Sequence, residues 1–154
     1  MLDVEAATRL RRAVSRIARR LNASATSEGL TPTQASVLGL IAGRGPTGLA
    51  RLAELEGLNP TMLSRVVGAL TDAGFIVRNP DPSDLRVQLV TATPAGVAAH
   101  ERIKAARAQT VSASASRLTS DQVAALVQAL PALEGLADEL SSLPQQATGA
   151  PGKR

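Results

Sequence analysis

Helix-start signals recur along this chain and constrain its fold more than any other feature of the sequence. Thr31-Pro32, Asn59-Pro60 and Thr93-Pro94 each place a capping side chain before a proline that suits the first helical position. Thr31 and Thr119 are also followed, three residues later, by a glutamine, which is the pattern of a capping box. With a start near Thr47 and a first helix without an evident cap, the sequence predicts six helices: residues 3–22, 32–42, 48–56, 60–73, 94–116 and 120–142.

One stretch after Gly74 breaks the helical pattern. Residues 75–78 are short and β-branched, and residues 87–91 alternate apolar and polar side chains, so both are expected to be strands. Residues 79–86 contain two prolines and are expected to form the exposed tip of a hairpin between them. The expected fold class is therefore mainly α with a small β-hairpin. Gly43 is expected to end the second helix, as Gly74 ends the fourth.

Composition excludes several functions. The 154 residues include no cysteine and a single histidine, His100, which argues against thiolate metal sites, thiol redox sensing and a histidine-rich zinc site. Motifs of serine hydrolases and of nucleotide-binding phosphate loops are missing, so we expect neither an enzyme nor a catalytic residue, metal or cofactor. The apolar stretches fall well short of the roughly 18 residues of a membrane span. We expect a cytoplasmic chain, because Asp3 and Glu5 argue against a transit peptide in the arginine-rich first helix.

Residues 48–73 have the form of a helix-turn-helix. The second of these helices begins after Asn59 and carries apolar residues at three- and four-residue spacing, which form its inward face: Leu63, Val66, Val67 and Leu70. Its opposite face begins with Thr61 and Ser64, two small hydrogen-bonding residues, and Arg65. Such a face fits the major groove of DNA. By itself the pattern is equally consistent with an ordinary amphipathic surface helix.

The hairpin that follows favours DNA binding. A helix pair followed by a hairpin with an arginine at its tip is a winged helix, and the wing can reach the minor groove. Asp84 lies two residues before Arg86 and could align its guanidinium before it meets DNA. The alternative is a surface ion pair worth about 0–1 kcal/mol. We favour a function for the pair because the tip carries no apolar contact that it could support.

The order of these motifs resembles the MarR family of bacterial transcription regulators. The resemblance spans residues 30–100, and its most specific part is the hairpin with the Thr-x-x-Gly that follows it. The matching segments are residues 30–34, 52–54, 61–67, 70, 73–78, 81–86 and 90–96. Asn59-Pro60 departs from the family, in which serine is commoner, but either residue caps a helix well.

The resemblance implies a winged helix-turn-helix dimer whose first and last helices form the dimerisation region. Residues 1–30 would be an N-terminal dimerisation helix, 31–92 the DNA-binding module, 93–143 the C-terminal linker and dimerisation helices, and 144–154 a disordered tail. The family's DNA-contacting positions of the recognition helix and the wing map onto Asn59, Thr61, Met62, Ser64, Arg65, Asp84 and Arg86.

Net charge adds little to this argument. Residues 44–91 hold five arginines and five acidic residues, so the predicted DNA-binding module is neutral although the whole chain carries +4. Residues 1–22 hold six arginines and two acidic residues, whereas residues 119–143 hold four acidic residues and no basic one. The DNA-binding prediction therefore depends on where Arg65 and Arg86 stand, since net charge contributes only non-specific attraction.

The terminal helices each carry an apolar stripe. The two stripes consist of Leu10, Val14, Ile17 and Leu21, and of Val123, Leu126, Leu130, Leu133, Leu136 and Leu140. A chain of this size would strain to bury both around a small winged core, so we expect them to meet across the two-fold axis of a homodimer. The alternative is that both helices fold back within one monomer.

The family resemblance also implies a ligand pocket between the dimer helices and the winged module. Arg12 and Arg16 could face an organic anion there, and His100 lies on the fifth helix, although an arginine face is usually solvated and a lone histidine usually structural. The expected function is a homodimeric regulator of double-stranded DNA with a pseudo-palindromic operator, a repressor released by a small anionic or aromatic ligand. The alternative is a winged-helix module that contacts protein without binding an operator.

Overall fold

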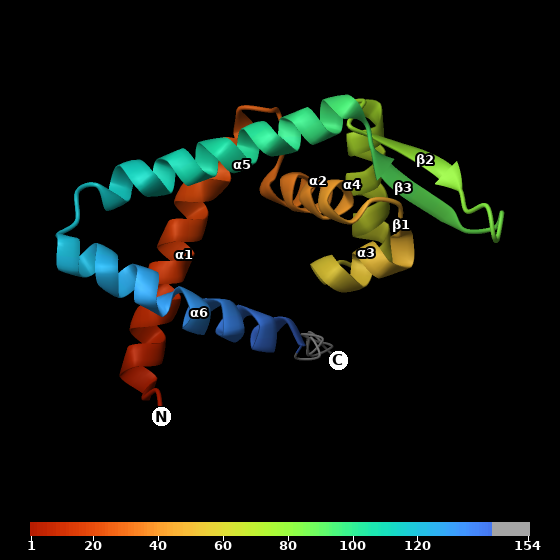
Figure 1. Ribbon diagram of the computed structural model, residues 1–154. Helices are drawn as coiled ribbons and strands as arrows, with labels where there is room; N and C mark the ends of the chain where they lie inside the picture. Colours follow the sequence, from red (N-terminus) through yellow and green to blue (C-terminus); the bar gives the residue numbers. More distant parts are fainter. Residues whose placement is uncertain (143–154) are drawn as a thin grey trace, which may run out of the picture. The chain divides into compact units, whose positions relative to one another are not determined.

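The computed structural model describes residues 1–142, in which Met1–Val111 forms one compact unit and the described residues from Ser112 onward form a second. The predicted tail, residues 144–154, lies outside the described residues. The elements in chain order are α1 (Val4–Thr26), α2 (Pro32–Arg44), β1 (Thr47–Gly48), α3 (Leu49–Glu56), α4 (Pro60–Asp72), β2 (Ile76–Pro80), β3 (Gln88–Ala92), α5 (Pro94–Ala115) and α6 (Ser120–Ser142) (Figure 1). The fold is mainly helical with a small antiparallel sheet, as predicted. Over the described part of the chain, no helix is both long and apolar enough to span a bilayer.

Hydrogen bonds confirm the predicted caps at Thr31, Asn59, Thr93 and Thr119, but not at Thr47, whose hydroxyl donates to the Gly45 carbonyl at 2.9 Å while Gly48 is the N-cap of α3. Thr31 Oγ1 accepts from the Gln34 backbone N–H at 3.2 Å, and Gln34 Oε1 accepts from the Thr31 N–H at 2.8 Å, which completes the capping box of α2. Thr119 and Gln122 make the same reciprocal pair at the start of α6, at 3.3 and 3.0 Å. Asn59 Oδ1 accepts from the Met62 N–H at 2.8 Å and caps α4. These short-range bonds define where the helices begin.

The first two helices differ from the prediction at three ends. α1 does have a cap, because Asp3 Oδ1 accepts from the Ala6 N–H at 2.7 Å. It continues to Thr26 since residues 22–25 contain neither glycine nor proline. α2 passes through Gly43 and ends at Arg44, and its C-cap is Gly45, which has a φ of +77° that favours glycine.

The sheet contains a strand that the sequence did not predict. Thr47 and Gly48 of β1 pair with Val90 and Leu89 of β3, and the sheet order is β1-β3-β2. Two residues are too few to show an alternating pattern. β2 also runs two residues further than expected, to Pro80, which is tolerated because β2 lies at the edge of the sheet.

The hydrophobic core lies in the first unit, where α2 packs against α1, α3, α4 and β3 (Figure 1). Its largest fully buried side chains come from these elements and from β2: Leu38, Ile41, Leu52, Leu70, Ile76, Val37, Val67 and Val90. Burial of each such side chain contributes about 1.5–3 kcal/mol. No side chain described on α6 is buried.

The Thr-x-x-Gly segment, Thr93 to Gly96, links the start of α5 to the residues that precede β2. The Thr93 N–H donates to the Phe75 carbonyl at 2.9 Å, and the Thr93 hydroxyl donates to the Gly74 carbonyl at 2.6 Å. The same hydroxyl accepts from the Gly96 N–H at 3.0 Å and caps the helix. A Cβ at Gly96 would lie 2.0 Å from the Phe75 carbonyl oxygen, so only glycine allows this approach. The hairpin therefore leaves the core at a defined place.

Side-chain hydrogen bonds connect α5 to the end of α1 and the turn that follows it, within the first unit. Arg102 donates through Nε and one terminal nitrogen to the two carboxylate oxygens of Glu28, each at 2.8 Å. This hydrogen-bonded pair lowers the pKa of Glu28 and raises the pKa of Arg102. Five residues further along α5, Arg107 Nε donates to Ser24 Oγ at 3.2 Å.

Candidate nucleic-acid interface

Helix α4, the second helix of the helix-turn-helix, is held in place by its buried side. Leu63, Val67 and Leu70 are almost fully buried and Val66 is partly buried, which confirms the predicted inward face. The preceding turn is tight because Gly57 adopts the left-handed conformation, with a φ of +63°, and the Leu58 N–H reaches back to the Ala53 carbonyl at 3.0 Å. The backbone of α4 is therefore positioned by packing.

The opposite side of α4 is exposed to solvent. Thr61, Ser64 and Arg65 are exposed, and the Met62 side chain is 49% exposed. Arg65 forms no hydrogen bond or ion pair within residues 1–142 and is available to a ligand. Asn59 uses its side-chain oxygen for the cap, and its amide N–H groups can donate to an outside partner.

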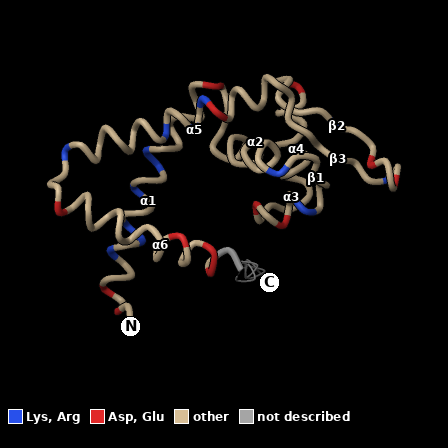
Figure 2. Tube along the Cα trace, viewed as in Figure 1, with Lys and Arg blue, Asp and Glu red and all other residues tan. Residues whose placement is uncertain are grey.

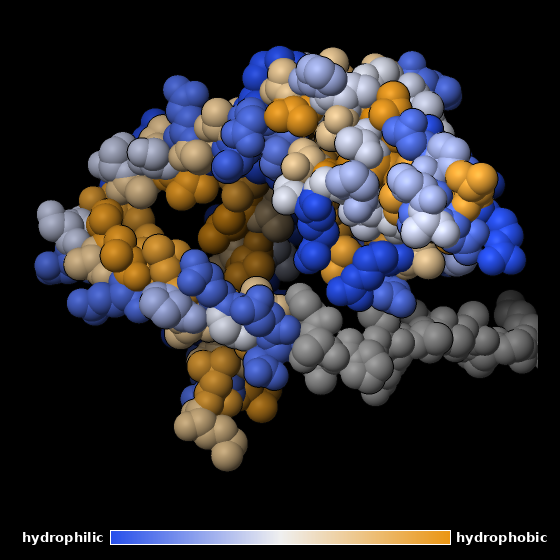
Figure 3. Space-filling model, turned by 45° about the vertical axis from the view of Figure 1, so that its right-hand side comes forward, coloured by the Kyte–Doolittle hydropathy of each residue, from blue (hydrophilic) through white to orange (hydrophobic). Residues whose placement is uncertain are grey.

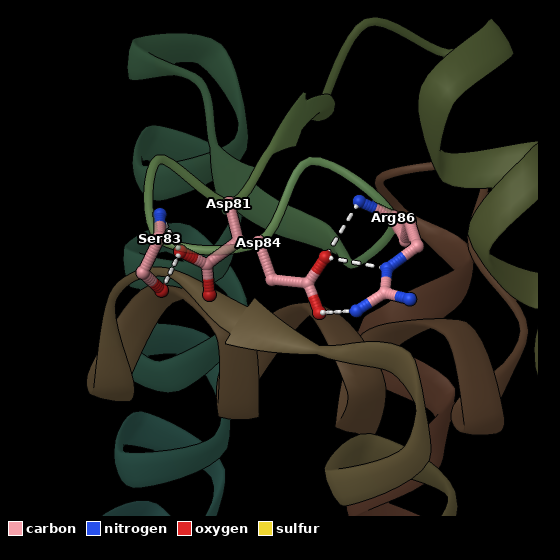
Figure 4. A network of polar contacts seen from close by, with 4 residues as sticks. All are labelled: Asp81, Ser83, Asp84 and Arg86. Carbon is pink, nitrogen blue, oxygen red and sulfur yellow. Dashed lines mark hydrogen bonds and ion pairs between the residues drawn. The ribbon is translucent and has the colours of Figure 1, made fainter.

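The tip of the hairpin holds Arg86 in one orientation (Figure 4). Arg86 Nε donates to Asp84 Oδ1 at 3.0 Å, and one terminal nitrogen donates to Oδ2 at 3.2 Å, so the contact is bidentate. The Arg86 backbone N–H donates to the same Oδ1 at 3.1 Å. These hydrogen bonds from Arg86 lower the pKa of the Asp84 carboxyl. The predicted pairing of the two side chains is confirmed, and the Arg86 side chain remains 91% exposed.

A second carboxylate orders the chain on the other side of the tip. Asp81 Oδ1 accepts from both the backbone N–H and the hydroxyl of Ser83, at 2.8 and 2.6 Å (Figure 4). These bonds lower the pKa of Asp81. The backbone closes the turn through the Asp81 N–H on the Val87 carbonyl and the Val87 N–H on the Asp84 carbonyl, both at 2.8 Å. Polar contacts therefore give the tip the order that a core gives α4.

Comparisons with known proteins agree with this geometry. The sequence pattern of the MarR family matches residues 30–87. An uncharacterised HTH-type transcriptional regulator of Mycobacterium leprae is 37% identical over 109 residues, which cover 70% of this chain and 74% of the relative. The chain belongs to the MarR family.

Solved structures share its fold. MarR of E. coli, in its apo form, superposes with a TM-score of 0.73 at 24% identity and covers 86% of this chain and 98% of its own. NadR in complex with 4-hydroxyphenylacetate gives 0.69 at 20% identity, over 88% of this chain and 91% of its own. The chain is thus a winged-helix transcriptional regulator and not an enzyme, and family membership implies that it binds DNA.

The expected ligand residues of this MarR-family chain do not all lie together. Arg16 borders an open hollow of about 450 Å³ beside α1, with Ala13, Ile17 and Arg20 as further lining residues. Arg12 is exposed and is not among these lining residues. The sequence analysis did not predict Arg20 as a ligand residue. Its position four residues after Arg16 was the available signal, because that spacing places both arginines on one face of the helix.

His100 lies elsewhere, in the packing between α5 and α2. It is partly buried, and its ring atoms lie 3.1 and 3.3 Å from the place that a Cβ on Gly39 would occupy. The ring thus fills the space that this glycine leaves on α2. This position favours a packing role for His100.

Both terminal helices of the regulator expose apolar and charged side chains. The apolar side chains of α1 and α6 that are about half exposed or more are Val4, Val14, Ile17, Leu126, Val127, Leu130 and Leu140. Figure 3 shows apolar surface on each of the two helices. Figure 2 shows the basic residues of α1 and the acidic residues in the later part of α6. Each helix thus has an apolar stripe that its own unit does not cover.

Proposed function

We propose that this chain is a homodimeric repressor that binds a pseudo-palindromic operator in double-stranded DNA and is released by a small anionic ligand. The observation that carries the proposal is the tip of the hairpin, where Asp84 orients the guanidinium of Arg86 through two hydrogen bonds while the Arg86 side chain stays 91% exposed. A carboxylate that orients an exposed arginine lowers the entropy lost when that arginine binds a second partner. DNA supplies such a partner in the negative potential of the minor groove.

The recognition helix would enter the major groove by its N-terminal turns. Thr61 and Ser64 are short, so they allow close approach and donate hydrogen bonds to phosphate or base edges, and Asn59 can donate through its amide. The exposed Met62 offers an apolar contact to a thymine methyl group. Arg65 is free of partners within residues 1–142 and can reach the O6 and N7 atoms of guanine.

The dimer is supported by the apolar stripes on α1 and α6. Side chains such as Ile17, 55% exposed, and Val127, 60% exposed, lie in apolar rows that a second copy of the chain can bury. Two copies related by a two-fold axis present two recognition helices to half-sites about 34 Å apart. A pseudo-palindromic operator follows from that symmetry.

Release by a ligand is supported by the hollow beside α1. Arg16 and Arg20 border it, and two guanidinium groups suit a carboxylate. NadR, of the same fold, was solved with 4-hydroxyphenylacetate, an aromatic anion. A ligand in the hollow beside α1 would favour one arrangement of the two DNA-binding modules over another. Arg12 and His100 are the less favoured contacts because Arg12 lies outside the lining residues and His100 packs on α2.

Gel-shift titration of the full chain against the duplex DNA that flanks its own gene tests the proposal. We expect one retarded complex, its loss in an Arg65→Ala/Arg86→Ala double variant and its weakening in each single variant. The complex should be retained in Arg117→Ala, which removes one positive charge elsewhere, as each single variant does. Adding 4-hydroxyphenylacetate or a related aromatic acid should weaken the complex, and Arg16→Ala/Arg20→Ala should reduce that response. Equal affinity for flanking and scrambled duplexes would instead support the protein-binding alternative.

Sedimentation of the same preparations tests the dimer. We expect a dimer at micromolar concentration and a monomer or an aggregate when residues 120–142 are deleted, because the stripe on α6 is then lost. A stable full-length monomer at that concentration would contradict the proposed assembly.

A further inference from the structure

An apolar side chain stands at the very tip of the hairpin. Leu85 lies between Asp84 and Arg86 and is 75% exposed. Among the described large apolar side chains, only Met1 and Val4 at the N-terminus are more exposed. Its neighbour Val87 is 40% exposed. Figure 3 shows apolar surface beside hydrophilic surface at the end of the hairpin. The proposed DNA contacts of the wing, Asp84 and Arg86, give Leu85 no role.

A singly exposed leucine is ordinary on a protein surface, so its setting has to decide whether it means anything. The backbone on both sides of Leu85 is fixed: the Arg86 N–H is bound to Asp84 Oδ1 at 3.1 Å, and the Val87 N–H to the Asp84 carbonyl at 2.8 Å. The contacts that orient the Arg86 guanidinium therefore also hold Leu85 outward. Leu85 is thus exposed at the same hairpin tip as Arg86.

The minor groove offers an apolar surface beside its phosphates. Its walls are the C–H groups of deoxyribose, and in A·T-rich steps they stand close together, so that a side chain entering the groove touches them. If the Arg86 guanidinium binds at the floor of the groove, the walls stay open to contact with the Leu85 side chain. Leucine is a side chain that minor-groove proteins commonly bring to bases and sugars.

We propose that Leu85 is a specificity-determining DNA contact: it packs against the deoxyribose walls of the minor groove where Arg86 enters, and so favours a narrow, A·T-rich groove at that position. The inference rests on the proposed operator binding. The contact is apolar and releases no counterions, whereas that of Arg86 does. Affinity due to Leu85 should consequently be independent of salt concentration.

The test uses the full chain and the shortest flanking duplex that it binds in the gel shift. Hydroxyl radicals attack deoxyribose in the minor groove, so footprinting locates the sugars that the wing covers. At those positions the duplex is made with A·T, with G·C, and with inosine·cytosine, which keeps the major-groove face of G·C but lacks the amino group in the minor groove. Variants are Leu85→Ala, Leu85→Met and Arg86→Ala, with Val97→Ala as a control because Val97 is 43% exposed on α5.

Leu85→Ala should lower the affinity for the A·T duplex about three- to tenfold for each wing engaged, with an unchanged slope of log K against log salt. Leu85→Met should keep most of the affinity, and Val97→Ala all of it. The wild-type chain should bind the inosine duplex like the A·T duplex and the G·C duplex more weakly, and Leu85→Ala should narrow that difference. Protection of the wing sugars should weaken in Leu85→Ala and persist in Val97→Ala.

Two results would overturn the inference while operator binding stands. One is that Leu85→Ala binds every duplex with wild-type affinity. Leu85 would then not contact DNA, and its exposure would instead suit a contact with protein. The other is an equal loss on A·T and G·C duplexes, which would show that Leu85 does not respond to the groove. If the wild-type chain binds none of the flanking duplexes, the proposed function fails and the inference fails with it.

Discussion

The recognition helix and the hairpin tip each present an arginine, and they do so by different means. Arg65 is free of partners within residues 1–142, yet its helix is fixed by Leu63, Val67 and Leu70 in the core. Arg86 stands on a hairpin tip with no core beneath it, and Asp84 holds its guanidinium through two hydrogen bonds. On the helix the backbone is ordered and the side chain is free, whereas at the tip the side chain itself is ordered.

This difference suits two kinds of recognition. A free guanidinium on a rigid helix can adjust to the edge of one base pair, at the cost of its own rotamer entropy. A guanidinium that is already oriented loses less entropy on binding but adapts less to the sequence that it meets. We therefore expect Arg65 to carry base discrimination and Arg86 to carry affinity and groove shape.

The largest effect should come from removing the packing that supports the helix. Leu70 is fully buried, so Leu70→Ala should lower the free energy of unfolding by about 2–5 kcal/mol. Chemical denaturation monitored by circular dichroism measures this. Val77→Ala, at a residue 43% exposed on β2, is the control and should change the stability by less than about 0.5 kcal/mol. Equal losses in the two variants would mean that α4 is not held by its buried side.

Arg65→Ala should have the next largest effect, on binding only. Loss of a guanine contact should cost about 1–3 kcal/mol per half-site and relax discrimination at particular base pairs. Arg65→Lys keeps the charge but cannot bind bidentately, so it should recover affinity more than discrimination. Affinities for cognate and base-substituted duplexes measure both. An even loss across all duplexes would assign Arg65 to phosphate instead.

Arg86→Ala should weaken cognate and substituted duplexes more evenly. Because one cation is lost from each wing, the slope of log K against log salt should flatten by roughly one per wing. A salt series of binding titrations measures this slope, with Arg117→Ala as the control for a lost charge. Should Arg86→Ala change the base preference in the major groove, the comparison between helix and wing would be wrong.

The smallest effect should come from Asp84, which acts through Arg86. Asp84→Asn frees the guanidinium without deleting it, so operator affinity should fall less than in Arg86→Ala. The lowered pKa of Asp84 means that the pair is intact at neutral pH and is lost as the pH falls through that lowered value. The NMR signal of Arg86 Nε–H should therefore titrate below the usual range of an aspartate, and Asp84→Asn should abolish that titration. A titration midpoint in the ordinary range of an aspartate would contradict the bidentate pairing of Asp84 with Arg86.

The elements that sequence reasoning recovered are those whose cause is local. Reciprocal bonds such as Thr31 with Gln34 join residues three apart, and the pairing of Asp84 with Arg86 joins residues two apart, so both can be predicted from spacing. The buried face of α4 follows equally from its period. The Asp3 cap of α1 is equally local, since it joins residues three apart.

Other features depend on contacts between distant parts of the chain and could not be predicted in that way. Strand β1 exists because Thr47 meets Val90, and Gly96 is required because the Phe75 carbonyl approaches it. His100 packs on Gly39, and Arg20 joins Arg16 at a hollow, through the same kind of tertiary arrangement. The sequence by itself determined the helices, the buried and exposed faces of α4 and the pairing of Asp84 with Arg86, because hydrogen bonds and periodicity over a few residues produce them. Only the tertiary structure decided how the hairpin is rooted and which side chains share a surface, because backbone approach and packing depend on residues far apart in the chain.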